Sequence, residues 1–184
     1  ARDANESYPF SIHTQAEIWD MGNEFVPLSK ILSEPGIGDF QTLPNVSSNL
    51  GFTDHHYWVK FTLENVDSET QTLYLETARP ITDVADLYML LEGQITKVIR
   101  NGDLTPFEDR EIQHRKLLFP ITLSPNSSAV FFLHLQSDGE VINLPLTLHN
   151  GASLIESTFT DQLVFGIFYG ILLLAALTYL FFYF

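Results

Sequence analysis

Acidic side chains gathered in short groups are the first candidates for chemistry in this sequence. Asp54, Asp83, Asp86 and Asp103 belong to such groups, and a further one occupies 108–111. Calcium takes about six to eight oxygen ligands, often from loop carboxylates and backbone carbonyls. We therefore name Asp54, Asp83, Asp86 and Asp103 as candidate calcium ligands. None of these groups has the spacing of an EF-hand loop, so solvated loop charge is the alternative explanation.

Aromatic side chains on expected strands are the second group of candidates. In the alternating run 57–64, Trp58 falls on the polar face, where its ring could stack on a sugar or another flat ligand. Tyr74 and Tyr88 are expected on neighbouring strands and could extend the same surface. The alternative is that both faces of a central strand are covered, which would make Trp58 a packing residue, because large aromatic side chains dominate burial energetics.

Two arginines complete the candidate ligand site. Arg79 and Arg110 could hold an anionic ligand, or a buried carboxylate, through two parallel hydrogen bonds. Arg79 precedes Pro80, which restricts it to an extended conformation and places it at the end of a strand.

Recognisable catalytic patterns are missing. The sequence has no nucleophile elbow, phosphate loop, HExxH motif or Rossmann glycine pattern. It has no cysteine, which excludes zinc–thiolate sites and a cysteine nucleophile, and its six histidines show no helical pairing. We therefore assign no catalytic residue and no cofactor other than the calcium that the acidic groups could hold. A glycan hydrolase would need two converging carboxylates, and Glu64 and Glu76, expected on the polar face of neighbouring strands, are the pair we name for that alternative.

The charge balance limits the partners. The net charge is −14, with only nine lysines and arginines against 23 acidic residues. Nucleic acid binding needs a basic face, and anionic lipid headgroups repel an acidic surface. We therefore expect no nucleic acid partner.

The elements that must position these residues read as short alternating strands. Apolar and polar residues alternate, between turn residues, in the runs 57–64, 71–77, 84–91, 94–100, 117–123, 129–136 and 142–148. Glu92-Gly93 joins two of them as a hairpin, and Pro145 places the last one at an edge or a bulge. This spacing predicts an all-β fold, a jelly-roll β-sandwich of about eight or nine strands.

The first 56 residues give a weaker pattern. Residues 18–19 and 25–26 could each be a strand, and residues 28–32 could form one short helical turn. The segment 34–51 is rich in Gly, Pro, Ser and Asn, which is typical of a long loop.

The segment 163–184 is an unbroken apolar run without charge, long enough as a helix to cross a hydrocarbon core of roughly 30 Å. We predict a sandwich domain at 1–155, a linker at 156–162 and a transmembrane helix at 163–184. Gly166 and Gly170 form a small-xxx-small pair, which permits close helix packing and indicates further membrane helices or a homodimer.

Several segments together resemble a known family. These are YWVKFTLEN (57–65), TLYLETARPITDVADLYML (72–90), NGDLTPFEDREIQHRKLLFPITL (101–123), FFLHLQSDGEVINLPLTL (131–148) and the start of the apolar run. Their content and order are similar to the extracytoplasmic sensor domain, type 2, of bacterial seven-transmembrane receptors with diverse intracellular signalling modules.

The resemblance implies a fold similar to carbohydrate-binding modules, with residues 1–162 in the periplasm and the helix in the bacterial inner membrane. It implies a full receptor with seven membrane helices and a cytoplasmic histidine kinase or diguanylate cyclase. Relatives differ in ligand, and calcium, a carbohydrate or another small molecule would each be compatible with the resemblance.

The expected function is therefore ligand sensing by a non-catalytic domain that signals through its membrane helix. A membrane-anchored glycan hydrolase and a structural scaffold that binds a partner protein are the alternatives.

Overall fold

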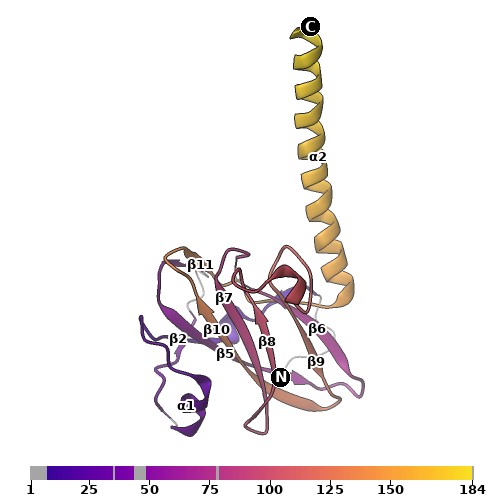
Figure 1. Cartoon of the computed structure of the whole chain (residues 1–184). Coiled ribbons are helices and arrows are strands. Elements are labelled where there is room, and N and C mark those ends of the chain that lie inside the picture. The colour runs from indigo at the N-terminus through magenta and orange to yellow at the C-terminus, as the bar shows by residue number, and fades with distance from the viewer. Residues whose placement is uncertain (1–7, 35, 44–48, 78, 184) are drawn as a thin grey trace.

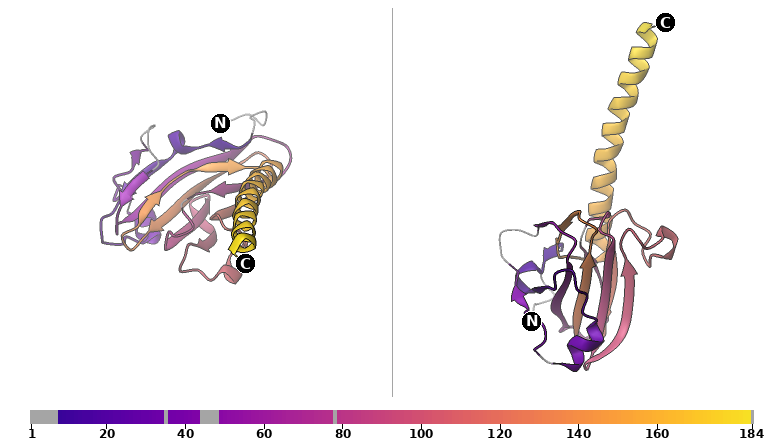
Figure 2. Two further views of the ribbon diagram at one scale, coloured as in Figure 1. Left: turned by 90° about the horizontal axis from the view of Figure 1, so that it is seen from above. Right: turned by 60° about the vertical axis from the view of Figure 1, so that its left-hand side comes forward.

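The structure is a computed structural model that describes residues 8–34, 36–43, 49–77 and 79–183. These residues form a two-layer β-sandwich from which one long helix projects (Figure 1). Two further views show that the helix leaves one end of the sandwich and touches it only at its base (Figure 2). The predicted β-sandwich followed by a long apolar helix is confirmed.

The larger sheet contains six antiparallel strands in the order β3-β2-β5-β10-β7-β8. Their bounds are β2 Glu17–Asp20, β3 Gln41–Thr42, β5 His56–Asn65, β7 Val84–Leu91, β8 Gln94–Asn101 and β10 Ser127–Gln136. The long strands β5 and β10 pair over their full length at its centre.

The smaller sheet contains four antiparallel strands in the order β1-β12-β6-β9. Their bounds are β1 Phe10–Ser11, β6 Gln71–Glu76, β9 Leu118–Leu123 and β12 Thr147–His149. A separate ribbon pairs β4 Asn49–Phe52 with β11 Val141–Asn143, and three short helical segments lie at η1 His13–Gln15, α1 Leu28–Ser33 and η2 Phe107–Asp109. The strands β8 and β9 are each the last of their sheet and do not pair with one another, so the sandwich is open along that side.

The core lies between the two sheets. The alternation predicted for 57–64 is confirmed, because Tyr57, Val59 and Phe61 of β5 all point inward and are buried. The ring of Phe61 stacks on Phe131 of the neighbouring strand β10, with centroids 5.2 Å apart. Burial of these large side chains between two sheets is the main stabilising contribution of such a fold.

A second apolar layer covers the outer face of the larger sheet. Trp58, Leu90 and Phe132 lie on this face and pack beneath Leu28 of α1. The indole Nε1 of Trp58 donates a hydrogen bond to the carbonyl oxygen of Val26 at 2.8 Å. The segment that follows β2 therefore closes this part of the sheet to solvent.

The local predictions were confirmed at some turns and wrong at others. The hairpin between β7 and β8 turns at Glu92 and Gly93, whose φ angles of 50° and 77° suit a two-residue hairpin loop. The helical turn predicted at 28–32 is α1. The strand predicted at 25–26 is not formed, and the predicted loop 34–51 contains β3 and the beginning of β4.

The last predicted strand, 142–148, is divided at Pro145. Its first part is β11, which pairs with β4, and its second part is β12, which joins the smaller sheet. A proline cannot donate to a strand ladder, and here it marks the point where the chain passes from one sheet to the other.

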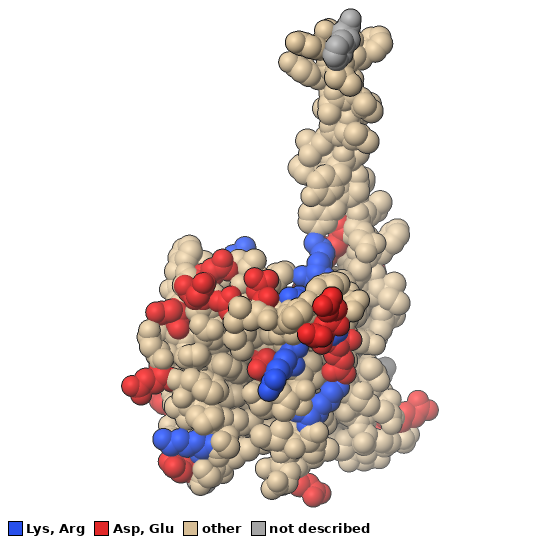
Figure 3. All heavy atoms as spheres, in the orientation of Figure 1, with Lys and Arg blue, Asp and Glu red and all other residues tan. Residues whose placement is uncertain are grey.

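The helix α2, Gly151–Tyr183, begins directly after β12 and is continuous for 33 residues, or about 50 Å. Asn150 caps it, since the Ser153 N–H donates to Asn150 Oδ1 at 2.8 Å and the Asn150 N–H donates to Ser153 Oγ at 3.1 Å. The segment 156–162, predicted as a linker, is therefore helical. Among the described residues, α2 is the one helix long and apolar enough to cross a membrane. Acidic side chains are spread over the sandwich, while the upper part of α2 shows no charged side chain (Figure 3).

Candidate functional site: the junction between the sandwich and the helix

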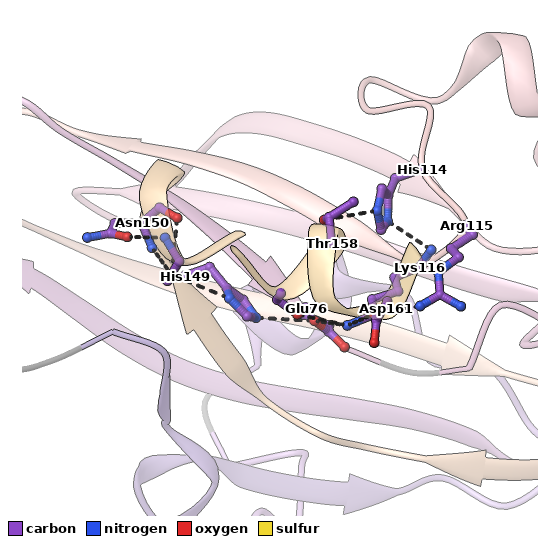
Figure 4. A network of polar contacts seen from close by, with 10 residues as sticks. Glu76, His114, Arg115, Lys116, His149, Asn150, Thr158 and Asp161 are labelled. Atoms are coloured by element: carbon purple, nitrogen blue, oxygen red, sulfur yellow. Dashed lines mark hydrogen bonds and ion pairs between the residues drawn. The ribbon is translucent and has the colours of Figure 1, made fainter. Parts of the chain in front are cut away.

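A network of polar side chains joins the smaller sheet to α2 (Figure 4). We call it the junction network, and its members are Glu76, His114, Arg115, Lys116, His149, Asn150, Ser153, Ser157, Thr158 and Asp161.

Glu76 is the centre of the sheet side of the network. It is the last residue of β6, and strand pairing places it between Thr147 of β12 and Leu118 of β9. Its Oε2 accepts hydrogen bonds from Lys116 Nζ at 3.1 Å and from His149 Nε2 at 3.1 Å. One carboxylate therefore ties together the helix-facing ends of three strands.

His149 is the last residue of β12, and its side chain is only 3% exposed. Burial lowers the pKa of this imidazole, while the charge of Glu76 and the hydrogen bond to it act in the opposite direction. Its Nε2 lies 3.1 Å from Glu76 Oε2, and its Nδ1 lies 3.5 Å from the hydroxyl of Ser153 in the first turn of α2.

The helix side of the network centres on Asp161. Its carboxylate pairs with Arg115 and with Lys116, whose Nζ is 3.2 Å away. Lys116 also lies 3.4 Å from the hydroxyl of Ser157, one turn earlier on the helix. Because Lys116 binds both Glu76 and Asp161, a single ammonium group connects the sheet to the helix.

Two further contacts extend the network. His114 Nε2 lies 3.4 Å from the hydroxyl of Thr158, and burial is the largest of the effects that lower the pKa of His114. The Arg115 guanidinium lies 4.8 Å from the ring centroid of Phe165, a cation–π distance. The network thus reaches the first residues of the apolar run.

The chemistry available here is ion pairing. Lys116 and Glu76 are 24% and 20% exposed, so solvent screens their pair only in part. Such a pair contributes about 0.5 to 1 kcal/mol, which is enough to favour one orientation of the helix on the sheet and small enough to be reversed by a ligand.

The predicted aromatic surface is not assembled. Trp58 is fully buried and meets Tyr88 edge to face at 5.4 Å, whereas Tyr74 lies on β6 in the other sheet. An open stacking platform built on Trp58 is therefore wrong, because the α1 segment covers its ring. Tyr88 remains half-buried at the margin of this cover.

The two predicted arginines lie in loops. Arg110 donates from Nη2 to the carbonyl of Gly102 at 2.7 Å and from Nε to the carbonyl of Thr105 at 3.3 Å. It therefore holds its own loop together. Arg79 is exposed and its carbonyl accepts from the Thr82 N–H at 3.0 Å, in a turn that ends before β7.

The four predicted calcium ligands do not converge. Asp54 accepts from an amide side chain at 3.0 Å, and Asp83 Oδ2 accepts from the Asp138 N–H at 2.7 Å. Asp86 lies within β7, where burial raises the pKa of its carboxyl, and Asp103 lies beyond β8. Within residues 8–34, 36–43, 49–77 and 79–183, no three His, Asp or Glu side chains are placed to share a metal ion.

The carboxylate pair named for a hydrolase is also separated. Glu64 lies on β5 in the larger sheet and Glu76 on β6 in the smaller one. The prediction of neighbouring strands was wrong because β5 and β6, although consecutive in sequence, enter different sheets.

Gly166 and Gly170 both lie in α2, and among the described residues no atom outside their own part of the helix lies within 4 Å of a Cβ added at either position. A partner for this helix face therefore remains a prediction.

Residues 23–150 match the family described as 7TMR-DISM extracellular 2. The chain belongs to this family. The matched part covers most of the described sandwich and ends at Asn150, the residue that caps α2. No curated protein matches the chain.

Solved structures similar to this 7TMR-DISM extracellular domain include three carbohydrate-active proteins. One is a family 35 carbohydrate-binding module from Clostridium thermocellum, with 12% identity and a TM-score of 0.38 over 79% of this chain and all of the module. A cycloisomaltooligosaccharide glucanotransferase from Paenibacillus sp. follows, with 13% identity, a TM-score of 0.34 and 80% of this chain covered. The third is a GH31 α-xylosidase from Xanthomonas citri, with 14% identity, a TM-score of 0.30 and 73% covered. The matched regions make up 19% and 15% of these two enzymes.

Proposed function

We propose that this extracellular domain is the ligand-sensing region of a bacterial signalling receptor, and that the junction network passes its movements to α2. The observation that supports this most directly is a capped, unbroken helix whose Asp161 pairs with Arg115 and Lys116 just before β9. Lys116 also binds Glu76 at the end of β6. A flexible linker would absorb a displacement of the sandwich, whereas a continuous helix transmits it.

The mechanism is a shift between two populations. A ligand that binds one arrangement of the strands better than another would change the balance between them by its difference in affinity. Movement of β9 relative to β6 would change the distance from Lys116 to Glu76, and Lys116 would then pull on or release Asp161. The signal would reach the membrane as a tilt or rotation of α2.

The cellular setting is also part of the proposal. We propose that residues 1–162 lie in the periplasm and that α2 enters the bacterial inner membrane, followed by further membrane helices and a kinase or cyclase module. Membership of a receptor family and the single candidate span support this arrangement. The ligand in this proposal is a small molecule.

Spin labels provide a direct test of the junction. The chain has no cysteine, so labels placed at Ser128→Cys and Glu156→Cys, both exposed, would be unique. In lipid nanodiscs we expect a narrow distribution of distances between them. The substitution Lys116→Met should broaden it, because the sheet and helix would lose their shared cation.

A matched control separates this effect from a general loss of charge. Lys60→Met removes an ion pair with Glu17 on the larger sheet, whereas the strand residues of the junction network, Glu76 and His149, belong to the smaller sheet. It should leave the distribution unchanged. An equally narrow distribution in Lys116→Met and in the parent would refute the proposal that the network holds the helix.

A further inference from the structure

A cavity of about 60 Å³ lies between the two sheets on the open side of the sandwich. On the larger sheet it is bounded by two cross-strand pairs of β7 and β8, Leu87 with Ile99 and Met89 with Lys97. Ile121 of β9 faces them from the smaller sheet, and Phe131 of β10 closes the inner end.

The cavity reaches the core. Leu87, Ile121 and Phe131 are each no more than 2% exposed, so its inner wall is the same apolar surface that holds the sheets together. A single water needs about 10–15 Å³ of such space together with two or more polar partners. The cavity is several times larger, and of the side chains that line it only those of Lys97 and Thr122 carry polar atoms, so it suits a compact apolar group better than a cluster of waters.

One cation stands at the mouth. Lys97 lines the cavity, and its ammonium group is 2.7 Å from a carboxylate oxygen of Glu111 in the loop between β8 and β9. Both side chains are 44% exposed, so this ion pair is screened by solvent and easily exchanged. A carboxylate of similar reach could replace Glu111 at the same ammonium.

We propose that this cavity is the sensor's ligand site and that it takes a small carboxylate with a compact apolar body, aromatic or branched aliphatic. This rests on the proposed sensing function and names its ligand class. The apolar body fills the space between Met89 and Ile121, and the carboxylate displaces Glu111 from Lys97. A sugar is a poor occupant, because Lys97 and Thr122 are the only polar side chains of the lining and most of its hydroxyl groups would lie against hydrocarbon without hydrogen-bond partners.

The site is connected to the junction network through one strand. Ile121 lies on β9, and Lys116 stands two residues before that strand begins. The strand β9 pairs with β6 along its whole length, and Glu76 is the last residue of β6. A ligand that separates β8 from β9, or that frees Glu111, therefore acts on the segment that carries the pairing cations of α2.

The probe is phenylacetate, with phenylacetamide as its uncharged counterpart. Binding is measured calorimetrically at pH 7 on the chain in lipid nanodiscs, because detergent could itself occupy an apolar cavity. We expect phenylacetate to bind with a Kd of about 1 mM or tighter and phenylacetamide to bind at least about fivefold more weakly.

Two substitutions that change the charge test the mouth of the site. Lys97→Met keeps the apolar stem and should abolish the preference for the anion while leaving phenylacetamide binding unchanged. Glu111→Gln frees the ammonium and should tighten phenylacetate binding about threefold or more. If Lys97 serves only to guard the edge strand against pairing with another chain, Lys97→Met will promote self-association without changing probe binding, which would overturn the proposal.

A third substitution tests the cavity itself. Met89→Trp should fill it and remove binding of both probes, whereas Leu91→Trp, at a partly buried inward position two residues along the same strand, should not. Equal binding in the parent and Met89→Trp, or no binding by the parent at 10 mM probe (about ten times the expected Kd), would overturn the proposal. The spin-label result at the junction is independent of the probes, so a failure here is distinguishable from a failure of the sensing function.

Discussion

Acidification should destabilise this sandwich through one buried imidazole, that of His134. The side chain lies on the outer face of β10, only 6% exposed, with its Nε2 3.1 Å from Nδ1 of His56. The ring of Phe25 covers both imidazoles at centroid distances of 4.7 and 5.4 Å. Asp86 is its neighbour on β7. Burial, and then the proximity of His56, lower the pKa of His134 to about 4.

The sign and the size of the effect follow from this difference. The unfolded chain binds a proton at His134 near pH 6.5, whereas the folded chain does so only near pH 4. Above pH 6.5 His134 is unprotonated in both the folded and the unfolded chain, and its contribution to the free energy of unfolding is fully present. As the pH falls from 6.5 towards 4, only the unfolded form gains the proton, and at about 1.4 kcal/mol for each pH unit the free energy of unfolding falls by about 2.5 kcal/mol at pH 4.5.

Urea unfolding in nanodiscs at pH 7 and pH 4.5, followed by tryptophan fluorescence, measures this loss. Trp58 is a suitable reporter because its ring lies 5.1 Å from His134. Carboxylates also titrate over this range, so the decisive quantity is the difference between the parent and His134→Phe. The variant should lose about 2.5 kcal/mol less on acidification, while His55→Gln, which removes an exposed imidazole paired with Asp20, should behave as the parent does. The same pH dependence in His134→Phe and the parent would refute the reasoning.

Three smaller predictions concern the backbone and the helix. Asn150→Ala removes the cap of α2, so it should lower the free energy of unfolding by about 1 kcal/mol and speed amide hydrogen exchange in the first turn of the helix. Unchanged exchange would argue against the cap. Gly102→Ala should lower the free energy of unfolding, measured in urea, by more than about 1 kcal/mol, because φ is +108° and the added Cβ would clash with the Asp83 carbonyl oxygen. The control Gly151→Ala adds a Cβ in open space and should change the free energy of unfolding by less than about 0.5 kcal/mol. Gly166→Leu should reduce chemical cross-linking between copies of α2 in nanodiscs while Ala175→Leu does not, and equal cross-linking in both would exclude a glycine-mediated dimer.

Periodicity accounts for the part of the fold that could be read from the sequence. Each strand has two faces, so the alternation in 57–64 already shows which side chains of β5 enter the core. It could not show that Trp58 would be covered on the other face, because the covering residues around α1 have no regular pattern and lie some thirty positions earlier, Val26 among them. Whether a polar face is open depends on a contact distant in sequence.

Sheet assignment explains the misplaced site residues. Trp58 and Tyr74 were expected on one surface because their strands are consecutive, yet a jelly-roll chain passes between sheets at many of its turns. The sequence did not reveal the junction network either, because its members come from separate elements and Lys116 and Asp161 are 45 positions apart. The start of α2 had a readable signal: Asn150 and Ser153 have the spacing of a capping box, which hydropathy alone does not register.

Because α2 is continuous, it also fixes the rotational orientation of the sandwich about the helix axis relative to the apolar part of the helix. Successive residues of a helix are rotated by about 100° and rise by about 1.5 Å, so each position in 151–162 sets the azimuth at which the sandwich faces its neighbours. Inserting one residue there would turn the whole sandwich by roughly a quarter of a revolution, whereas inserting seven would return it nearly to its original bearing and lift it by about 10 Å. This stretch of helix therefore sets the orientation of the sandwich about the helix axis, and receptors built by joining this sandwich to another membrane region would have to keep its number of residues or change it by about seven.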